Sequence, residues 1–110
     1  MGNRRHIDTF KKDNCLVDII FQHKGKENSI GTRELVRALG EYGYKVQGDN
    51  IHTMVKRVVL ERHLPICGLT QHGYYWATSK QDVQSCIDEL QYKIDGLQER
   101  IDLLKSFICE

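Results

Sequence analysis

Residues 63–76 read HLPICGLTQHGYYW, and this stretch interrupts a chain whose other segments have helical periodicity. Two short runs of β-favouring residues, 66–69 and 74–78, flank a polar turn at 71–73. Pro65 ends the preceding helix, because the residue before a proline is disfavoured in helical geometry. The stretch therefore predicts a small β-hairpin with a polar tip.

Three helical patterns precede this hairpin. Apolar residues recur at helical spacing over 14–23, 29–40 and 50–63. The expected N-caps of these helices are Asp13 or Asn14, Thr32 and Asp49, respectively. The fold class predicted for the whole chain is mainly α with a small β-hairpin (α+β).

Charge and periodicity divide the 110-residue chain into two parts, which we call the head (1–79) and the tail (80–110). The head has 12 Lys or Arg and 8 Asp or Glu, giving +4, and the tail has 4 and 7, giving −3. Within the head, residues 1–12 are polar and basic and read as a mobile arm, which leaves 13–79 as the folded domain. A basic head suggests a polyanionic partner.

Residues 29–78 resemble the winged helix-turn-helix DNA-binding domains, in particular small ones of phages and prophages. The resemblance is carried by a second helix reading IGTRELVRAL, a third helix ending in RHLPI and a strand reading GYYWAT. It implies duplex DNA binding by a small transcriptional regulator or a phage DNA-transaction protein. The connector between the second and third helices, 40–48, is longer than in a compact helix-turn-helix.

The third helix has a polar arc opposite its apolar side, where His52, Thr53, Lys56 and Arg57 fall together with Leu60. A recognition helix needs such an arc to meet base edges in the major groove. Lys56 and Arg57 would contact phosphates, Arg57 could chelate a guanine, and His52 and Thr53 are candidate base contacts. The plainer interpretation is a solvated helix face.

Two further segments are candidates for DNA contact. Gln71 and His72 at the hairpin tip would meet phosphates or the minor groove. Arg4 and Arg5 could lie in an adjacent groove, as homeodomain arms do, or belong to an unengaged terminus.

Catalytic and metal-binding patterns are weak. His63, Cys67 and His72 are close in sequence, but no fourth ligand stands at a recognisable spacing, and no motif orients a Cys–His pair. We therefore expect no enzyme activity, metal or cofactor. The N-terminus resembles no signal peptide, so we expect a cytoplasmic protein with reduced cysteines at Cys15, Cys67, Cys86 and Cys109.

The tail carries the strongest pattern in the chain, an unbroken series of apolar residues at alternating spacings of four and three. We call these residues the stripe: Val83, Ile87, Leu90, Ile94, Leu97, Ile101, Leu104 and Ile108. Isoleucine at the a positions and leucine or valine at the d positions is typical of two-stranded coiled coils. The stripe predicts a long helix that joins two copies, although parallel, antiparallel and four-helix arrangements remain open, as does packing back on the head.

The sequence thus predicts a dimeric DNA-binding protein with no membrane association and no evident small-molecule substrate. The alternative is a protein–protein adaptor built from the same head and tail, because a head charge of +4 is modest.

Overall fold

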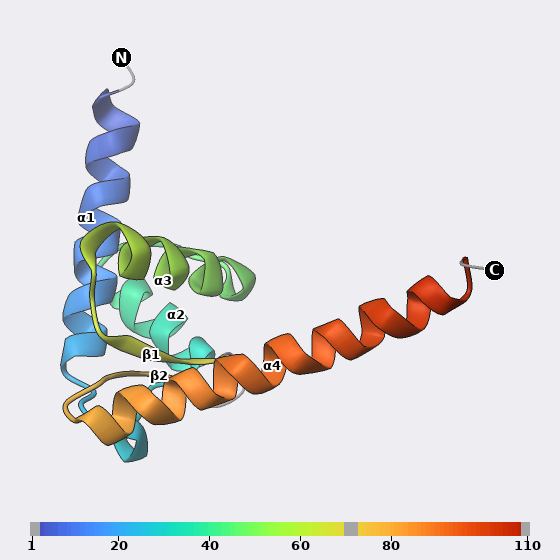
Figure 1. Ribbon diagram of the computed structural model, residues 1–110. Helices are drawn as coiled ribbons and strands as arrows, with labels where there is room; N and C mark the ends of the chain where they lie inside the picture. Colours follow the sequence, from blue (N-terminus) through green and yellow to red (C-terminus); the bar gives the residue numbers. More distant parts are fainter. Residues whose placement is uncertain (1–2, 70–72, 109–110) are drawn as a thin grey trace.

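The computed structural model describes residues 3–69 and 73–108, which form four α-helices, a short 3-10 helix and a two-stranded hairpin (Figure 1). In chain order the elements are α1 (Asn3–Phe21), η1 (Lys26–Asn28), α2 (Thr32–Glu41), α3 (Gly48–Arg62), β1 (Ile66–Leu69), β2 (Gly73–Trp76) and α4 (Lys80–Ser106). The predicted α+β class is confirmed. No helix in the described ranges has both the length and the apolar character needed to cross a membrane.

The hairpin pairs β1 antiparallel to β2, with Ile66 opposite Trp76 and Leu69 opposite Gly73. β1 has the expected bounds, whereas β2 ends at Trp76 and not at Thr78. The ladder stops there because Pro65, which precedes β1, has no N–H to donate. Its carbonyl still accepts from the N–H of Ala77 at 2.9 Å.

The segment between α1 and α2 forms β-bridges with the outer edge of β2, which the sequence did not predict. Ile30 and Tyr74 exchange two backbone hydrogen bonds, each 2.8 Å long. Trp76 likewise donates to the carbonyl of His23 at 2.7 Å and accepts from Gly25 at 3.0 Å. β2 is therefore paired on both sides, which ties the start of α2 to the hairpin.

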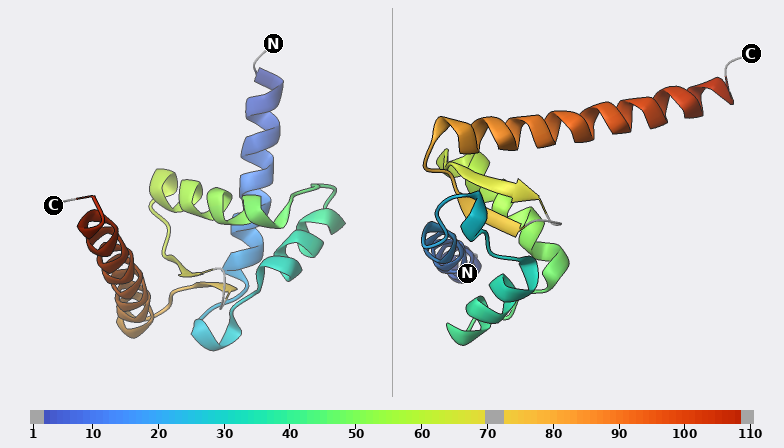
Figure 2. Two further views of the ribbon diagram at one scale, coloured as in Figure 1. Left: turned by 90° about the vertical axis from the view of Figure 1, so that its right-hand side faces the viewer. Right: turned by 90° about the horizontal axis from the view of Figure 1, so that it is seen from below.

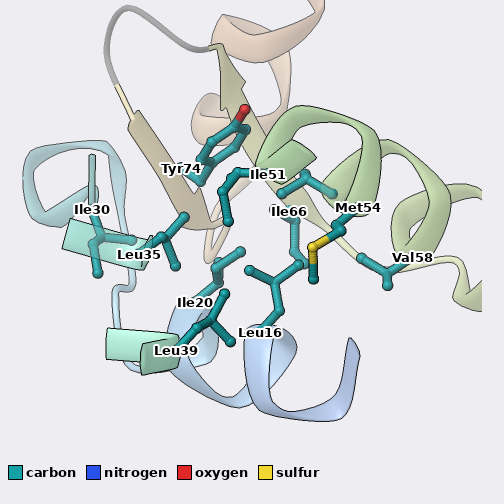
Figure 3. Close-up of a cluster of buried hydrophobic side chains, with 11 residues drawn as sticks. Leu16, Ile20, Ile30, Leu35, Leu39, Ile51, Met54, Val58, Ile66 and Tyr74 are labelled. Carbon is teal, nitrogen blue, oxygen red and sulfur yellow. The ribbon is translucent and has the colours of Figure 1, made fainter. Parts of the chain in front are cut away.

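The main core lies where α1, α2, α3 and the hairpin meet (Figure 3). Its buried side chains are Leu16, Ile20, Ile30, Leu35, Leu39, Ile51, Met54, Val55, Val58, Ile66 and Tyr74. Every helix of the head supplies residues at helical spacing, so the predicted apolar stripes of the helices do face one core.

The first helix is longer than predicted. α1 begins at Asn3, so the arm expected over 1–12 is wrong for residues 3–12, which form the first turns of the helix. No proline or glycine interrupts 3–21, and Arg and Lys are good helix formers. Asp13 and Asn14 consequently lie inside α1 and do not cap it.

Two other expected caps are also wrong. The N-cap of α2 is Gly31, and Thr32 is the first helical residue. The N-cap of α3 is Gln47, and Asp49 lies in the first turn, where its charge still favours the helix dipole. Gly31 has no side chain that could cap α2, and the side chain of Gln47 makes no capping bond to α3.

The base of α4 docks on the hairpin. Ser79 caps the helix as expected, accepting from the N–H of Asp82 at 3.1 Å. Cys86 packs against a second small cluster formed by Cys67, Tyr75 and Ala77. The Tyr75 hydroxyl donates to the carbonyl of Asp82 at 3.3 Å, which joins β2 to the first turn of α4.

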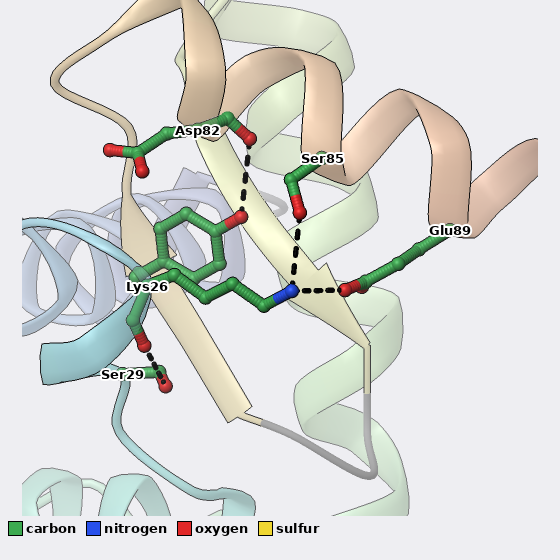
Figure 4. A network of polar contacts seen from close by, with 6 residues as sticks. Lys26, Ser29, Asp82, Ser85 and Glu89 are labelled. Carbon is green, nitrogen blue, oxygen red and sulfur yellow. Dashed lines mark hydrogen bonds and ion pairs between the residues drawn. The ribbon is translucent and has the colours of Figure 1, made fainter.

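A lysine from η1 completes this docking (Figure 4). The ammonium of Lys26 lies 2.7 Å from a carboxylate oxygen of Glu89 and donates to the Ser85 hydroxyl at 3.1 Å. These contacts end at Glu89, about one third of the way along α4.

The remainder of α4 projects beyond the head (Figure 2). The radius of gyration is 16.8 Å, whereas a compact domain of this length would have about 13 Å. The projecting part of α4 and the first turns of α1 both contribute to this excess (Figure 1). The stripe is exposed and does not fold back on the head.

Candidate functional site

One side of α3 is buried and the other is open. The buried side consists of Ile51, Met54, Val55 and Val58. The exposed side carries His52, Thr53, Lys56 and Leu60, which we call the α3 face. Three of the four predicted α3 contacts therefore lie together on one accessible surface.

The fourth predicted contact, Arg57, is engaged elsewhere. Its guanidinium lies 2.6 Å from one oxygen of Asp13 and donates to the other at 3.3 Å. Asp13 is 4% exposed, so the pair lies at the edge of the core between α1 and α3. The hydrogen bond to Asp13 raises the pKa of Arg57. Arg57 thus bridges α3 to α1, an engagement that the sequence did not predict for this residue.

The α3 face touches the hairpin through one polar contact. The hydroxyl of Tyr74 lies 3.5 Å from Nδ1 of His52, at the long limit of a hydrogen bond. The ring of Tyr74 is buried, and this burial raises the pKa of its hydroxyl, which therefore keeps its proton at neutral pH. The Tyr74 hydroxyl is thus the group of β2 that approaches the His52 side chain. The sequence did not indicate this contact.

The charge of the α3 face is small. Lys56 is exposed, and the exposed Asp49 in the first turn offsets it. Arg62, in the last turn, donates to the side chain of Asn14 at 2.7 Å and stacks over Phe10, so it also serves the α1–α3 contact. Lys56 is consequently the α3 cation that remains free among the described residues of this helix.

The other predicted DNA contacts fall largely outside what the structure describes. Gln71 and His72 lie outside the described residues. Arg4 and Arg5 lie in the first turn of α1, and their side chains are likewise outside. Within the described part of the chain, no group of three or more His, Cys, Asp or Glu side chains is arranged to hold a metal ion.

The thiols have the character of core residues. Burial raises the pKa of Cys67 to about 12, with a further contribution from Cys86, and burial also raises the pKa of Cys15. Both groups are therefore protonated at neutral pH and are weak nucleophiles.

The stripe on α4 is exposed along its whole described length. The exposed fractions range from 40% at Val83 to 80% at Ile108. Such a continuous apolar surface is unusual for a monomer. The eight predicted positions all lie on this surface, and Leu103 and Phe107 widen it near its end.

The chain matches no protein-family model, and no curated protein or solved structure is significantly similar to it. Its function must therefore be inferred from its own contacts, burial and charge.

Proposed function

We propose that the head is a winged helix that binds duplex DNA, with α3 as its recognition helix, and that α4 joins two heads in a homodimer. The observation that carries this proposal is the open polar α3 face, with His52, Thr53 and Lys56 accessible beside a hairpin. Such a helix fits the major groove, where Lys56 would contact a phosphate and His52 and Thr53 would meet base edges.

The order of elements supports the winged-helix assignment. The hairpin follows α3 in the chain. Ile30, which precedes α2, forms a β-bridge with Tyr74 of this hairpin. This pairing ties β2 to the segment that leads into α2. Gln71 and His72 remain proposed contacts, as do Arg4 and Arg5 at the start of α1.

Dimerisation through α4 is supported by the exposed stripe. Eight aliphatic side chains at least 40% exposed would be removed from water by a second copy. Fully burying one such side chain is worth about 1.5–3 kcal/mol, which leaves a large favourable sum after the entropic cost of association.

The test is a gel-shift and fluorescence-anisotropy series on the full chain, using duplexes from a random pool and from the DNA around its gene. Lys56→Ala should weaken binding to every duplex and flatten the salt dependence by about one unit, because one phosphate contact is lost. Thr53→Ala and His52→Ala should instead weaken the preferred duplexes selectively. Lys80→Ala is the matched control. It also removes one positive charge, but from the first residue of α4, beyond the base of the hairpin.

An adaptor function is the second candidate, and two observations favour it. Arg57 is held by Asp13, and Leu60 is 66% exposed on the α3 face, which suits a protein surface as well as DNA. If the chain binds no duplex, or if binding is independent of salt and of Lys56, the adaptor function replaces DNA binding.

A further inference from the structure

We propose that two copies of α4 pair in parallel and in register, with the basic flank of one helix against the acidic flank of the other. This inference rests on the proposed dimer and adds the direction of pairing. It follows from the different chemistry of the two flanks that border the stripe.

One flank is acidic and internally bonded. Numbering the heptad with Ile87 at a, the e positions carry glutamine and the following b positions carry aspartate. Each glutamine amide donates to the aspartate one turn later: Gln84 to Asp88 at 2.9 Å, Gln91 to Asp95 at 2.9 Å and Gln98 to Asp102 at 2.8 Å. We call this edge the acidic flank. The repeated bond holds each carboxylate beside the glutamine at the edge of the stripe.

The opposite flank is basic. Its g positions carry Lys93 and Arg100, and its c positions at the same level are the uncharged Gly96 and Leu103. Neither cation has an ion-pair partner among the described residues. Glu89, which precedes Lys93 by one turn, is bound to Lys26 of the head at 2.7 Å. We call this edge the basic flank.

Pairing direction decides which flanks meet. In a parallel pair, each g residue faces the e residue five positions later in its mate, so Lys93 lies beside Gln98 and the Asp102 bonded to it. Arg100 lies beside Lys105, with Asp102 of the second copy one turn away. In an antiparallel pair, each flank faces its own kind, and Lys93 meets Arg100 while acidic flank meets acidic flank. Lys105, an e residue, opposes the parallel arrangement in the last turn, but Asp95 and Asp102 outnumber it.

The composition of the stripe fits a pair of helices. In parallel coiled coils, isoleucine at a with leucine at d favours two strands over three or four. The head contacts α4 through Asp82, Cys86 and Glu89, and the stripe beside them remains open from Val83 onward. A parallel mate can therefore occupy the entire stripe.

Three variants of the full chain test the direction by sedimentation equilibrium. The first reverses the basic flank (Lys93→Glu with Arg100→Glu), the second reverses the acidic flank (Asp95→Lys with Asp102→Lys), and the third combines all four changes. Parallel pairing predicts that each single-flank variant dimerises roughly tenfold more weakly than the parent, because like charges then face each other. The combined variant should return to the parental dissociation constant.

The second variant excludes a net-charge explanation. It changes the formal tail charge from −3 to +1, so overall repulsion between two tails falls, yet parallel pairing still predicts a weaker dimer. If both single-flank variants dimerise like the parent, or the second more tightly, parallel pairing is wrong and the proposed dimer stands. A monomeric parent overturns the dimer itself.

A cross-link provides a second readout. In a parallel pair, Leu104→Cys places two thiols face to face, and oxidised glutathione should join them with release of two molecules of reduced glutathione. In an antiparallel pair that matches all eight stripe positions, the two residues would be about 25 Å apart and could not form a disulfide. Peptide mapping separates this link from any made by the native cysteines, and its absence in a dimeric sample contradicts the parallel arrangement.

Discussion

At the scale of single residues, the main finding is that Arg57 is paired with Asp13 across α1 and α3. Helical periodicity alone places Arg57 near the polar arc of α3, but it lies at the boundary of that arc, within reach of α1. The carboxylate that it meets, Asp13, is 44 positions away in the chain, and no local pattern indicates a partner at that separation. The sequence could therefore predict the exposed residues of α3 but not which of its charges is already paired.

Arg57→Ala should lower the free energy of unfolding by about 2–3 kcal/mol, because it leaves the buried carboxylate of Asp13 without a partner. The lower part of the usual range applies, since the Arg57 side chain is 33% exposed. Urea denaturation measures the loss. Combining Arg57→Met with Asp13→Asn should recover part of it, as no unpaired charge stays buried. Parental stability of Arg57→Ala would show that the pair contributes nothing.

The thiol of Cys67 gives a pH dependence of known sign. Its pKa is raised to about 12 in the folded state, so between its ordinary value and 12 the folded chain keeps a proton that the unfolded chain loses. Stability should therefore fall as pH rises from about 9 toward 12. Cys67→Ala should flatten this dependence in urea denaturation series at about pH 8 and about pH 9.5. An unchanged slope would contradict the assignment.

At the scale of elements, the sequence indicated the three α-helices of the head, the hairpin and the long tail helix, but not η1. The reason is that each is amphipathic or bounded by Pro65 or glycine. What it could not indicate was the β-bridge at Ile30, because a single bridged residue has no periodicity. The start of α1 was also missed, since basic residues without an apolar stripe fit a helix as well as an arm.

The β-bridge between Ile30 and Tyr74 leads to a prediction at Gly73. Its φ is +84°, and a Cβ there would lie 2.6 Å from the carbonyl oxygen of Ile30. Gly73→Ala should therefore destabilise the head by more than the cost of a positive φ alone, which is about 1 kcal/mol. Gly43→Ala is the control, because Gly43 has a similar φ of +91° and no atom within 4 Å of the added Cβ. Equal losses of stability in thermal denaturation would show that the close approach is unimportant.

At the scale of the whole molecule, a compact head is joined to a helix that extends well beyond it. The principal extents are 54 × 39 × 24 Å, and the longest reflects the projecting part of α4. The stripe was predictable because its spacing is regular over the whole tail. Docking of its base on the hairpin was not, because Lys26, Tyr75 and Cys67 come from three separate segments.

Changing Leu97 and Ile101 to Asp should convert the protein to a monomer with a folded head. Unpaired charges in a dry seam are expensive, and neither residue touches the core of the head. Affinity for a two-site duplex should fall as well, since the second head no longer benefits from a high effective concentration. Sedimentation equilibrium and circular dichroism measure both properties, and a double mutant that remains dimeric would move the interface into the head.

The docked base of α4 determines how the two heads of the proposed dimer would be placed on one DNA duplex. Only residues 77–79 separate β2 from α4, and Tyr75, Cys86 and Lys26 fasten the helix to the head on both sides of this joint. In the proposed dimer, each head is therefore fixed relative to its own α4. The paired helices then set both the separation and the relative rotation of the two heads. Because duplex DNA turns once in about 10.5 base pairs, adding five between two half-sites would carry one to the opposite side of the double helix. A dimer of this kind would discriminate between half-site spacings as strictly as between base sequences.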